Sequence, residues 1–326
     1  MDDSLILQPD HKTARKVFSR VGAAFFVLVA STIILQIMIA VIAGFVSEGL
    51  ETEAWYIWML SIAPYLATIP IFWSIVKKIP AVKISPQHMG AGQFCVLLIM
   101  CIGILYAGGI IGSVVSAAIQ SMTGLTPTNW VQEIVLGSDW IWNMLFAVIL
   151  APFIEELLFR KLLIDRIVKF GEGIAVLSSA LLFGLFHGNL HQFFYAFGLG
   201  AMFAYVYIKT GKLQYPVVLH MVINFMGSVL APAVLSLAPE LDLLETVPMS
   251  NDQTAGLFLA GLYTLVFTGL GLAGIVLLIV RRKTFVLNKA SSILPKEKRF
   301  YVVWLNTGTL LFILACLFLF VFSLLQ

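Results

Sequence analysis

Six polar side chains lie within hydrophobic segments of this 326-residue chain, and together they provide the groups that hydrolysis needs. They are Glu155, Glu156, Arg160, His187, His220 and Asn224. An ionisable side chain at membrane depth costs roughly 2.5–3.5 kcal/mol on insertion scales, so such residues usually have a function. Carboxylates and imidazoles act as general bases and proton carriers, and an amide can stabilise an oxyanion. The set therefore indicates hydrolytic chemistry.

The first group contains two adjacent carboxylates with different expected roles. Glu156 and Arg160 are four residues apart, so on an α-helix they share a face and can form an ion pair. Glu155 is turned away from that pair by about 100°. We therefore expect Glu156 and Arg160 to support the site, and Glu155 to face a cavity as a general base.

The other two groups repeat the spacing of four residues. Phe183 and His187 share one helical face, where Phe183 can wall the site and His187 can hold a water molecule. His220 and Asn224 share a face of another helix, and an imidazole with an amide donor suits an oxyanion pocket. The predicted catalytic residues are Glu155, His187, His220 and Asn224, with Glu156, Arg160 and Phe183 as supporting residues.

A proline is expected to loosen the helix beside the first group. Pro152 lies three residues before Glu155 and has no backbone N–H. In a regular α-helix this frees the carbonyl of Val148, one turn earlier. The sequence therefore predicts an unpaired backbone acceptor next to the candidate base.

Each group also has a structural interpretation. A single histidine in an apolar helix is more often a hydrogen-bond partner between helices than a catalyst, and Glu156 with Arg160 could be a structural pair. An intramembrane acid with histidines could also relay protons in a transporter. Such transporters often contain inverted repeats, and this chain has no second Glu-Glu segment. We expect Asn189 and His191 to be structural residues near a turn.

Zinc is the alternative to a metal-free mechanism. Zinc usually takes three or four histidine, cysteine or carboxylate ligands, which here would be Glu155, His187 and His220. The chain has no His-Glu-x-x-His motif, and Asn224 would be an unusual zinc ligand. The sequence therefore favours a glutamate-dependent mechanism with no metal and no other cofactor.

The composition is that of a multi-pass α-helical membrane protein. Hydrophobic residues make up 60% of the chain and charged residues 11%, with a mean hydropathy of +0.98, whereas soluble domains have about 25% charged residues. We expect an all-α transmembrane bundle of about eight to nine spans, each about 20 residues long. The candidate segments are roughly 21–46, 54–76, 92–120, 139–166, 172–188, 191–208, 214–237, 254–280 and 300–325.

The charges of the loops predict the orientation and the organisation of the chain. With nine spans, all 20 Lys and Arg residues fall on one side of the membrane, and acidic residues fill the loops of the other side. By the positive-inside rule the N-terminus is cytoplasmic. We divide the chain into an N-terminal tail (1–20), N-terminal spans (21–138), a catalytic core (139–237) and C-terminal spans (238–326). The net charge of +3 gives no reason to expect nucleic acid as a partner.

Three short motifs resemble those of one protease family. They are EELLFR at 155–160, FGLFH at 183–187 and HMVIN at 220–224. They match the patterns Glu-Glu-x-x-x-Arg, Phe-x-x-x-His and His-x-x-x-Asn of the CPBP intramembrane proteases. That family includes the type II CAAX prenyl endopeptidases and the bacterial Abi proteins. The resemblance covers roughly residues 140–230.

The resemblance implies hydrolysis of a peptide bond within the membrane. It assigns water activation to Glu155 and His187, and oxyanion stabilisation to His220 and Asn224. The expected partners are a protein or peptide substrate and the lipid bilayer. Candidate substrates are of the CAAX, bacteriocin-related or signalling kind, and the expected location is a bacterial cell membrane. The alternative is a non-catalytic membrane scaffold or a bacteriocin self-immunity protein.

The predicted depths of the two histidines differ. His220 lies about six residues, and His187 about fifteen, from the cytoplasmic ends of their expected spans. At about 1.5 Å per residue the difference in depth is about 13 Å. Helix tilt, or a fifth helix that starts below the membrane surface, is needed to bring them into one site.

Overall fold

Every regular element in the described part of the chain is a helix. The computed structural model describes residues 11–46, 49, 53–238, 250–288 and 294–325. In this part the elements are α1 (His11–Val46), α2 (Ala54–Val76), α3 (Ala91–Thr123), α4 (Trp130–Leu136), α5 (Trp140–Trp142), η3 (Asn143–Leu150), α6 (Ala151–Glu156), η4 (Leu157–Leu162), α7 (Leu163–Ile167), η5 (Val168–Phe170), α8 (Glu172–Phe186), α9 (Leu190–Thr210), α10 (Gln214–Phe225), η6 (Met226–Leu230), α11 (Ala231–Leu235), α12 (Asn251–Val280), η8 (Arg282–Thr284), α13 (Lys296–Val303) and α14 (Thr307–Leu325). Of these, η3, η4 and η6 are π-helical and η5 and η8 are 3₁₀-helical.

The predicted multi-pass membrane protein is confirmed. Among the described residues, eight helices are long and apolar enough to cross a membrane. They are α1, α2, α3, the composite helix Trp140–Phe170, α9, the composite helix Gln214–Leu235, α12 and α14. The fifth predicted span, 172–188, forms α8, whose 15 residues are fewer than the about 20 that a span needs.

Two boundaries differ from the prediction. The first helix begins at His11, within the predicted tail, because Lys, Arg and Ala in this segment favour a helix; residues 1–10 lie outside the described residues. The last predicted span is divided into α13 and α14. Asn306 separates them: its amide donates to the carbonyls of Val302 and Val303, and its Oδ1 accepts the N–H of Thr309. One side chain thus ends α13 and caps α14.

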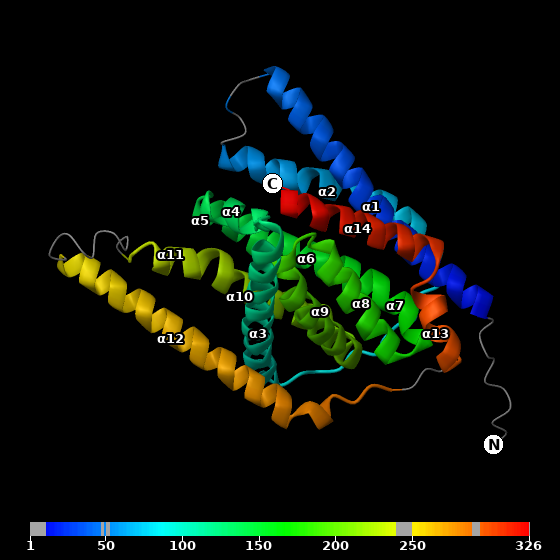
Figure 1. The fold of residues 1–326 in the computed structure, drawn as a ribbon. Helices are drawn as coiled ribbons and strands as arrows, with labels where there is room; N and C mark the ends of the chain where they lie inside the picture. The colour runs from blue at the N-terminus through cyan, green and yellow to red at the C-terminus, as the bar shows by residue number, and fades with distance from the viewer. Residues whose placement is uncertain (1–10, 47–48, 50–52, 239–249, 289–293, 326) are drawn as a thin grey trace.

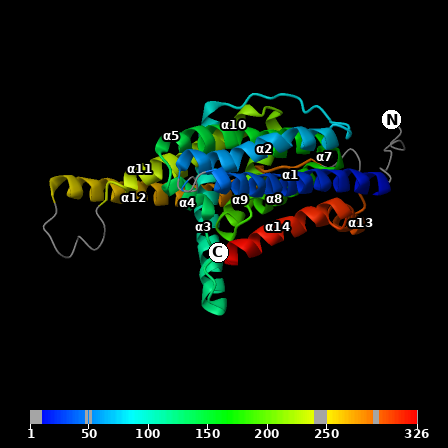
Figure 2. The same cartoon turned by 90° about the horizontal axis from the view of Figure 1, so that it is seen from above.

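The motif-bearing helices lie between two flanking groups of long helices (Figures 1 and 2). On one side α1 packs against both α2 and α14, and on the other α3 packs against α12 and α9. In both views α3 stands at a steep angle to the other long helices. Helix α8 packs along α9, so the candidate site is enclosed by segments distant in the sequence.

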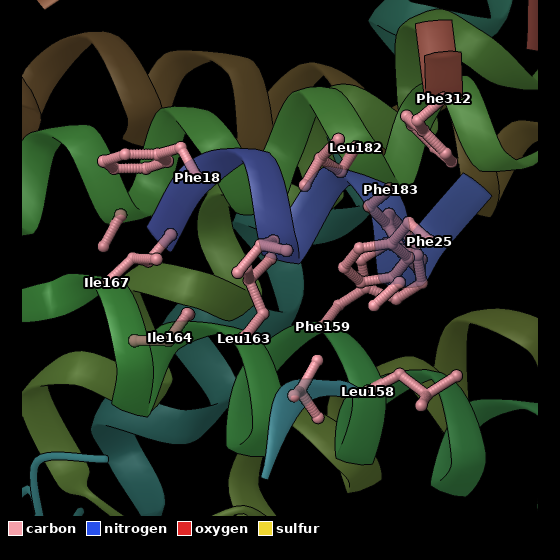
Figure 3. Close-up of a cluster of buried hydrophobic side chains, with 14 of the residues drawn as sticks. Phe18, Phe25, Leu158, Phe159, Leu163, Ile164, Ile167, Leu182, Phe183 and Phe312 are labelled. Atoms are coloured by element: carbon pink, nitrogen blue, oxygen red, sulfur yellow. The ribbon is translucent and has the colours of Figure 1, made fainter. Parts of the chain in front are cut away.

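An aromatic cluster fixes the helix of the first motif to the N- and C-terminal helices (Figure 3). The ring of Phe159 stacks on that of Phe25 at 4.8 Å and meets Phe183 edge-on at 5.2 Å. Phe25 also contacts Phe72 and Phe312, at 4.9 and 5.8 Å. Aromatic pairs at such distances add to the stability gained by burial, and here they hold α1, α2, α14, η4 and α8 together.

Polar contacts join several helix ends that carry basic residues. Arg166 at the end of α7 donates to the carbonyl of Val76 at the end of α2, at 2.7 Å. Lys209 near the end of α9 pairs with Glu172 at the start of α8. These ends therefore lie on one side of the bundle, as the loop charges predict, while the side of the membrane that they face stays a prediction.

Candidate active site

The buried ion pair predicted between Glu156 and Arg160 is confirmed. Arg160 Nε lies 2.8 Å from Glu156 Oε2, and both side chains are completely buried. An unpaired charge at such depth is strongly unfavourable, so each group depends on the other. The guanidinium also lies over the rings of Phe183 and Phe203, at 4.6 and 5.5 Å from their centroids. The pair is thus held in an aromatic box.

His220 lies between the two adjacent glutamates. Its Nδ1 is 3.0 Å from Glu156 Oε1, and because a carboxylate can only accept, Nδ1 carries the donated proton. Its Nε2 is 3.9 Å from Glu155 Oε2, which is too far for a hydrogen bond. Glu156 is therefore bound by both Arg160 and His220, whereas Glu155 keeps an exposed fraction of 15% and has no such partner among the described residues.

His187 has a defined tautomer at the end of α8. Its Nδ1 lies 2.8 Å from the carbonyl oxygen of Phe183, and a carbonyl can only accept. Nδ1 therefore carries the proton, which leaves Nε2 of the neutral ring as an acceptor. This is the form in which a histidine can bind or deprotonate water.

Phe183 brings the two histidines into one site. Its ring lies 4.8 Å from that of His187 and 5.7 Å from that of His220, edge-on to both. The difference in depth expected from the sequence is therefore closed in the folded chain, where one phenylalanine ring contacts both imidazoles. Phe183 is 1% exposed, so it is a wall between the histidines and the hydrophobic core.

The turn after His187 is held by Asn189. Its Oδ1 accepts the backbone N–H of Gln192, and its Nδ2 donates to the carbonyl of His187. Asn189 thus caps α9 and fixes the end of α8, as a turn residue should. His191 Nε2 lies 3.1 Å from the carbonyl oxygen of Pro127, which is a structural contact, as the sequence suggested.

The proline beside the site frees a backbone acceptor in a π-wound helix. The helix is π-wound over η3, where the N–H of Ala151 donates to the carbonyl of Phe146, five residues back. In this winding the missing N–H of Pro152 frees the carbonyl of Ala147, five residues back. The prediction of Val148 assumed α-helical spacing, and it stays a prediction.

Two asparagines form a reciprocal connection between the composite helices. Asn224 Nδ2 donates to Ala147 O at 2.8 Å, which satisfies the carbonyl that proline freed. Asn143 Nδ2 donates in the other direction to Ser228 O at 3.1 Å and also to Val135 O at 2.8 Å. Asn224 thus binds the carbonyl that lies four residues after Asn143, and Asn143 binds the carbonyl that lies four residues after Asn224. One N–H of Asn224 is therefore engaged in packing, and its second amide N–H has no partner among the described residues.

Asn143 is a residue that the sequence reasoning missed. It is 2% exposed, and it holds the helix of the glutamates against the helix of His220. A signal was available: the residues Val-Leu-Ala-Pro at 229–232 repeat the Ile-Leu-Ala-Pro at 149–152, and each follows an asparagine within nine residues. Such a repeat indicates two proline-disturbed helices that need side-chain donors.

The zinc alternative does not fit the described geometry. No group of three or more histidine, cysteine, aspartate or glutamate side chains in the described residues could hold a metal ion. Glu155, His187 and His220 do not form such a group. Metal independence itself stays a prediction.

Comparisons with known proteins agree with this geometry over the same segment. Residues 137–226 match the family model described as type II CAAX prenyl endopeptidase, Rce1-like. The predicted family resemblance is confirmed. This Rce1-like segment begins just before Asn143 and ends just after Asn224, so it contains all three motifs.

Two curated relatives match the chain over a limited region. The membrane-embedded CAAX protease MroQ of Staphylococcus aureus is 31% identical over 86 residues, which cover 24% of this chain and 35% of the relative. CAAX prenyl protease 2 of Homo sapiens is 31% identical over 124 residues, which cover 32% of this chain and 36% of the relative. The chain thus spans about a third of the length of these relatives. No solved structure matches it.

Proposed function

We propose that this protein is an intramembrane endopeptidase that hydrolyses a peptide bond with a water molecule activated by Glu155 and His187. The observation that carries the proposal is the unequal engagement of two adjacent carboxylates. Glu156 is bound by Arg160 and His220, while Glu155 is partly exposed and accepts no hydrogen bond among the described residues, its nearest basic partner being His220 Nε2 at 3.9 Å. A general base must be free to take a proton, and Glu155 meets that condition.

The reaction needs no group beyond these side chains and water. Glu155 accepts a proton from water, and the water oxygen attacks the carbonyl carbon of the substrate. The proton then passes to the leaving nitrogen as the C–N bond breaks, which gives a free amine and a carboxylate. Nε2 of His187, an acceptor in the neutral ring, orients the water.

We assign stabilisation of the oxyanion to His220 and Asn224. The second amide N–H of Asn224 is a permanent donor. His220 Nε2 can donate only when the ring carries both protons, because Nδ1 already donates to Glu156. Glu156, Arg160 and Phe183 support these residues without taking part in proton transfer.

The substrate class and the orientation are parts of the same proposal. The names of the relatives support proteins with a CAAX sequence as candidate substrates, beside bacteriocin-related and signalling proteins. The Staphylococcus relative supports a bacterial cell membrane. The basic residues of the loops on one side of the bundle support a cytoplasmic N-terminus through the positive-inside rule. In sealed inverted vesicles, an N-terminal tag accessible to protease supports that orientation, and a protected tag contradicts it.

The decisive experiment compares purified wild-type protein with Glu155→Gln in liposomes, against quenched peptides that include farnesylated Cys-aliphatic-aliphatic-X sequences. Loss of a general base is expected to slow cleavage by about 10²–10⁴-fold. Glu133→Gln, the same change at an exposed position on α4, is the matched control and should cleave like wild type.

The outcomes separate the alternatives. Undiminished cleavage by Glu155→Gln overturns the role of Glu155. Cleavage that a chelator abolishes and zinc restores overturns the metal-free mechanism. A folded wild type that cleaves no peptide argues for the scaffold or self-immunity alternative, and partner capture in membranes then becomes the next measurement.

A further inference from the structure

Tyr65 of α2 has a buried hydroxyl with no hydrogen-bond partner in the described part of the chain. The residue is 6% exposed, and its Oη is enclosed. Buried polar atoms are nearly always paired in native proteins, and an orphan requires an explanation such as a ligand or a catalytic role. Helix α2 lies outside residues 137–226 that match the family model, so no motif identifies this tyrosine.

The position of Tyr65 is next to the candidate active site. Its ring lies 5.7 Å from that of Phe186, the residue that precedes His187. Its hydroxyl interacts electrostatically with Glu155 without forming a hydrogen bond to it. The backbone at Tyr65 is also fixed, because Thr68 Oγ1 donates to its carbonyl at 2.9 Å. The ring is therefore held against the end of α8 that carries His187, and the hydroxyl forms no hydrogen bond to the candidate base.

The other donors of the site are partly engaged. His220 uses Nδ1 for Glu156, and its Nε2 donates only when the ring is doubly protonated. Asn224 uses one N–H for Ala147. A phenol O–H donates without any change of protonation. Tyr65 is thus an unengaged donor, whereas the other two donors have partners of their own.

We propose that Tyr65 is a catalytic residue that donates a hydrogen bond from Oη to the oxygen of the scissile carbonyl as negative charge develops on it. The inference rests on the proposed function, because it needs a peptide bond under attack by water. The hydrogen bond strengthens as the tetrahedral intermediate forms, and no proton has to leave the tyrosine.

The test is the kinetics of Tyr65→Phe with the quenched farnesylated peptides, with Tyr56→Phe as the matched control. Tyr56 lies on the same helix and is also 6% exposed. Loss of one oxyanion donor is expected to lower kcat by about 10²-fold. KM should stay unchanged, because the hydrogen bond is made in the transition state. Tyr56→Phe should change neither constant.

The results distinguish this inference from the proposed function. If wild type cleaves and Tyr65→Phe has the kcat of Tyr56→Phe, the role of Tyr65 is wrong and the endopeptidase stands. A wild type that cleaves no peptide overturns both. If Tyr65→Phe does not fold, fluorotyrosines at position 65 keep the hydroxyl and vary its donor strength. A kcat that follows donor strength supports the inference, and a constant kcat overturns it.

Discussion

Two regions of the molecule share the short sequence Leu-Ala-Pro, and only the first of them leads directly into the candidate catalytic base. In both, a π-helical segment ends at the leucine, Leu150 or Leu230, and the proline follows two residues later. In both, the alanine before the proline donates to a carbonyl five residues back, from Ala151 to Phe146 and from Ala231 to Met226. Each proline removes the next donor, so each helix is left with a freed carbonyl.

The two freed carbonyls have different surroundings. That of Ala147 receives the amide of Asn224 from the other helix, and the chain then continues through α6 to Glu155. The equivalent position in the second helix, Gly227, is exposed, and no described side chain donates to it; α11 ends a few residues later, at Leu235. The comparison teaches that the proline alone makes no site. The first segment is held in place because the amide of Asn224, on a helix distant in the sequence, donates a hydrogen bond to its freed carbonyl.

Removing one member of the buried ion pair between Glu156 and Arg160, which follows the first segment, should have the largest effect on stability. Arg160→Met leaves Glu156 buried with His220 as its remaining polar partner. We expect a loss of about 3–5 kcal/mol in the free energy of unfolding, which is typical when one member of a buried pair is removed. Titration with a denaturing detergent, followed by circular dichroism, measures this loss.

The control is an ion pair of the same spacing nearby. Lys161 lies 2.7 Å from Asp165; the Lys161 side chain is 44% exposed, whereas that of Asp165 is 6% exposed and also accepts from the hydroxyl of Tyr207. Lys161→Met should therefore cost less than Arg160→Met, because Lys161 is largely solvated and Asp165 keeps Tyr207 as a partner. Equal losses for Arg160→Met and Lys161→Met would show that burial of the first pair is unimportant. The double variant Arg160→Met with Glu156→Gln should be more stable than Arg160→Met alone, because no unpaired charge remains.

Removing the side-chain donor to the carbonyl of Ala147 should have an intermediate effect on the free energy of unfolding. Asn224→Ala leaves the carbonyl of Ala147 unpaired, which should cost about 1–3 kcal/mol. Pro152→Ala restores a backbone N–H that can bind that carbonyl in the π winding. In this background Asn224→Ala should therefore cost less, by about 1 kcal/mol in a double-mutant cycle.

The second segment provides the comparison for that cycle. Asn143 donates to Ser228, not to the carbonyl that Pro232 frees. Asn143→Ala and Pro232→Ala should therefore be additive. Coupling in the second cycle, or additivity in the first, contradicts the assignment of Asn224 to the freed carbonyl.

Local patterns predicted much of this molecule. The nine apolar segments follow from hydropathy, and the contact between Glu156 and Arg160 follows from helical spacing, because both depend on residues close in the sequence. The division of the last segment at Asn306 was not predicted, since its three bonds depend on how α13 and α14 meet.

Packing between distant segments decided the rest of the site. The sequence put His187 and His220 at different depths, and only the contact of Phe183 with both rings brings them together. The partner of Asn224 depends on π winding, which periodicity does not reveal. Tyr65 lies far from the motifs in the sequence, and its orphan hydroxyl becomes visible only when α2 is packed against α8 through Phe186.

The smallest expected effect is that of Pro232→Ala. This proline lies in the first turn of α11, where a missing N–H is tolerated and the fixed φ suits a helix. The restored N–H would face an exposed position, so the free energy of unfolding should change by no more than about 0.5 kcal/mol. Cleavage should be unaffected, because α11 carries none of the proposed catalytic groups. The same substitution at Pro152 acts one turn before Glu155 and competes with Asn224, so it should lower kcat. Equal effects of the two proline variants on cleavage would mean that the two segments are equivalent, and that the donor from the neighbouring helix does not position Glu155.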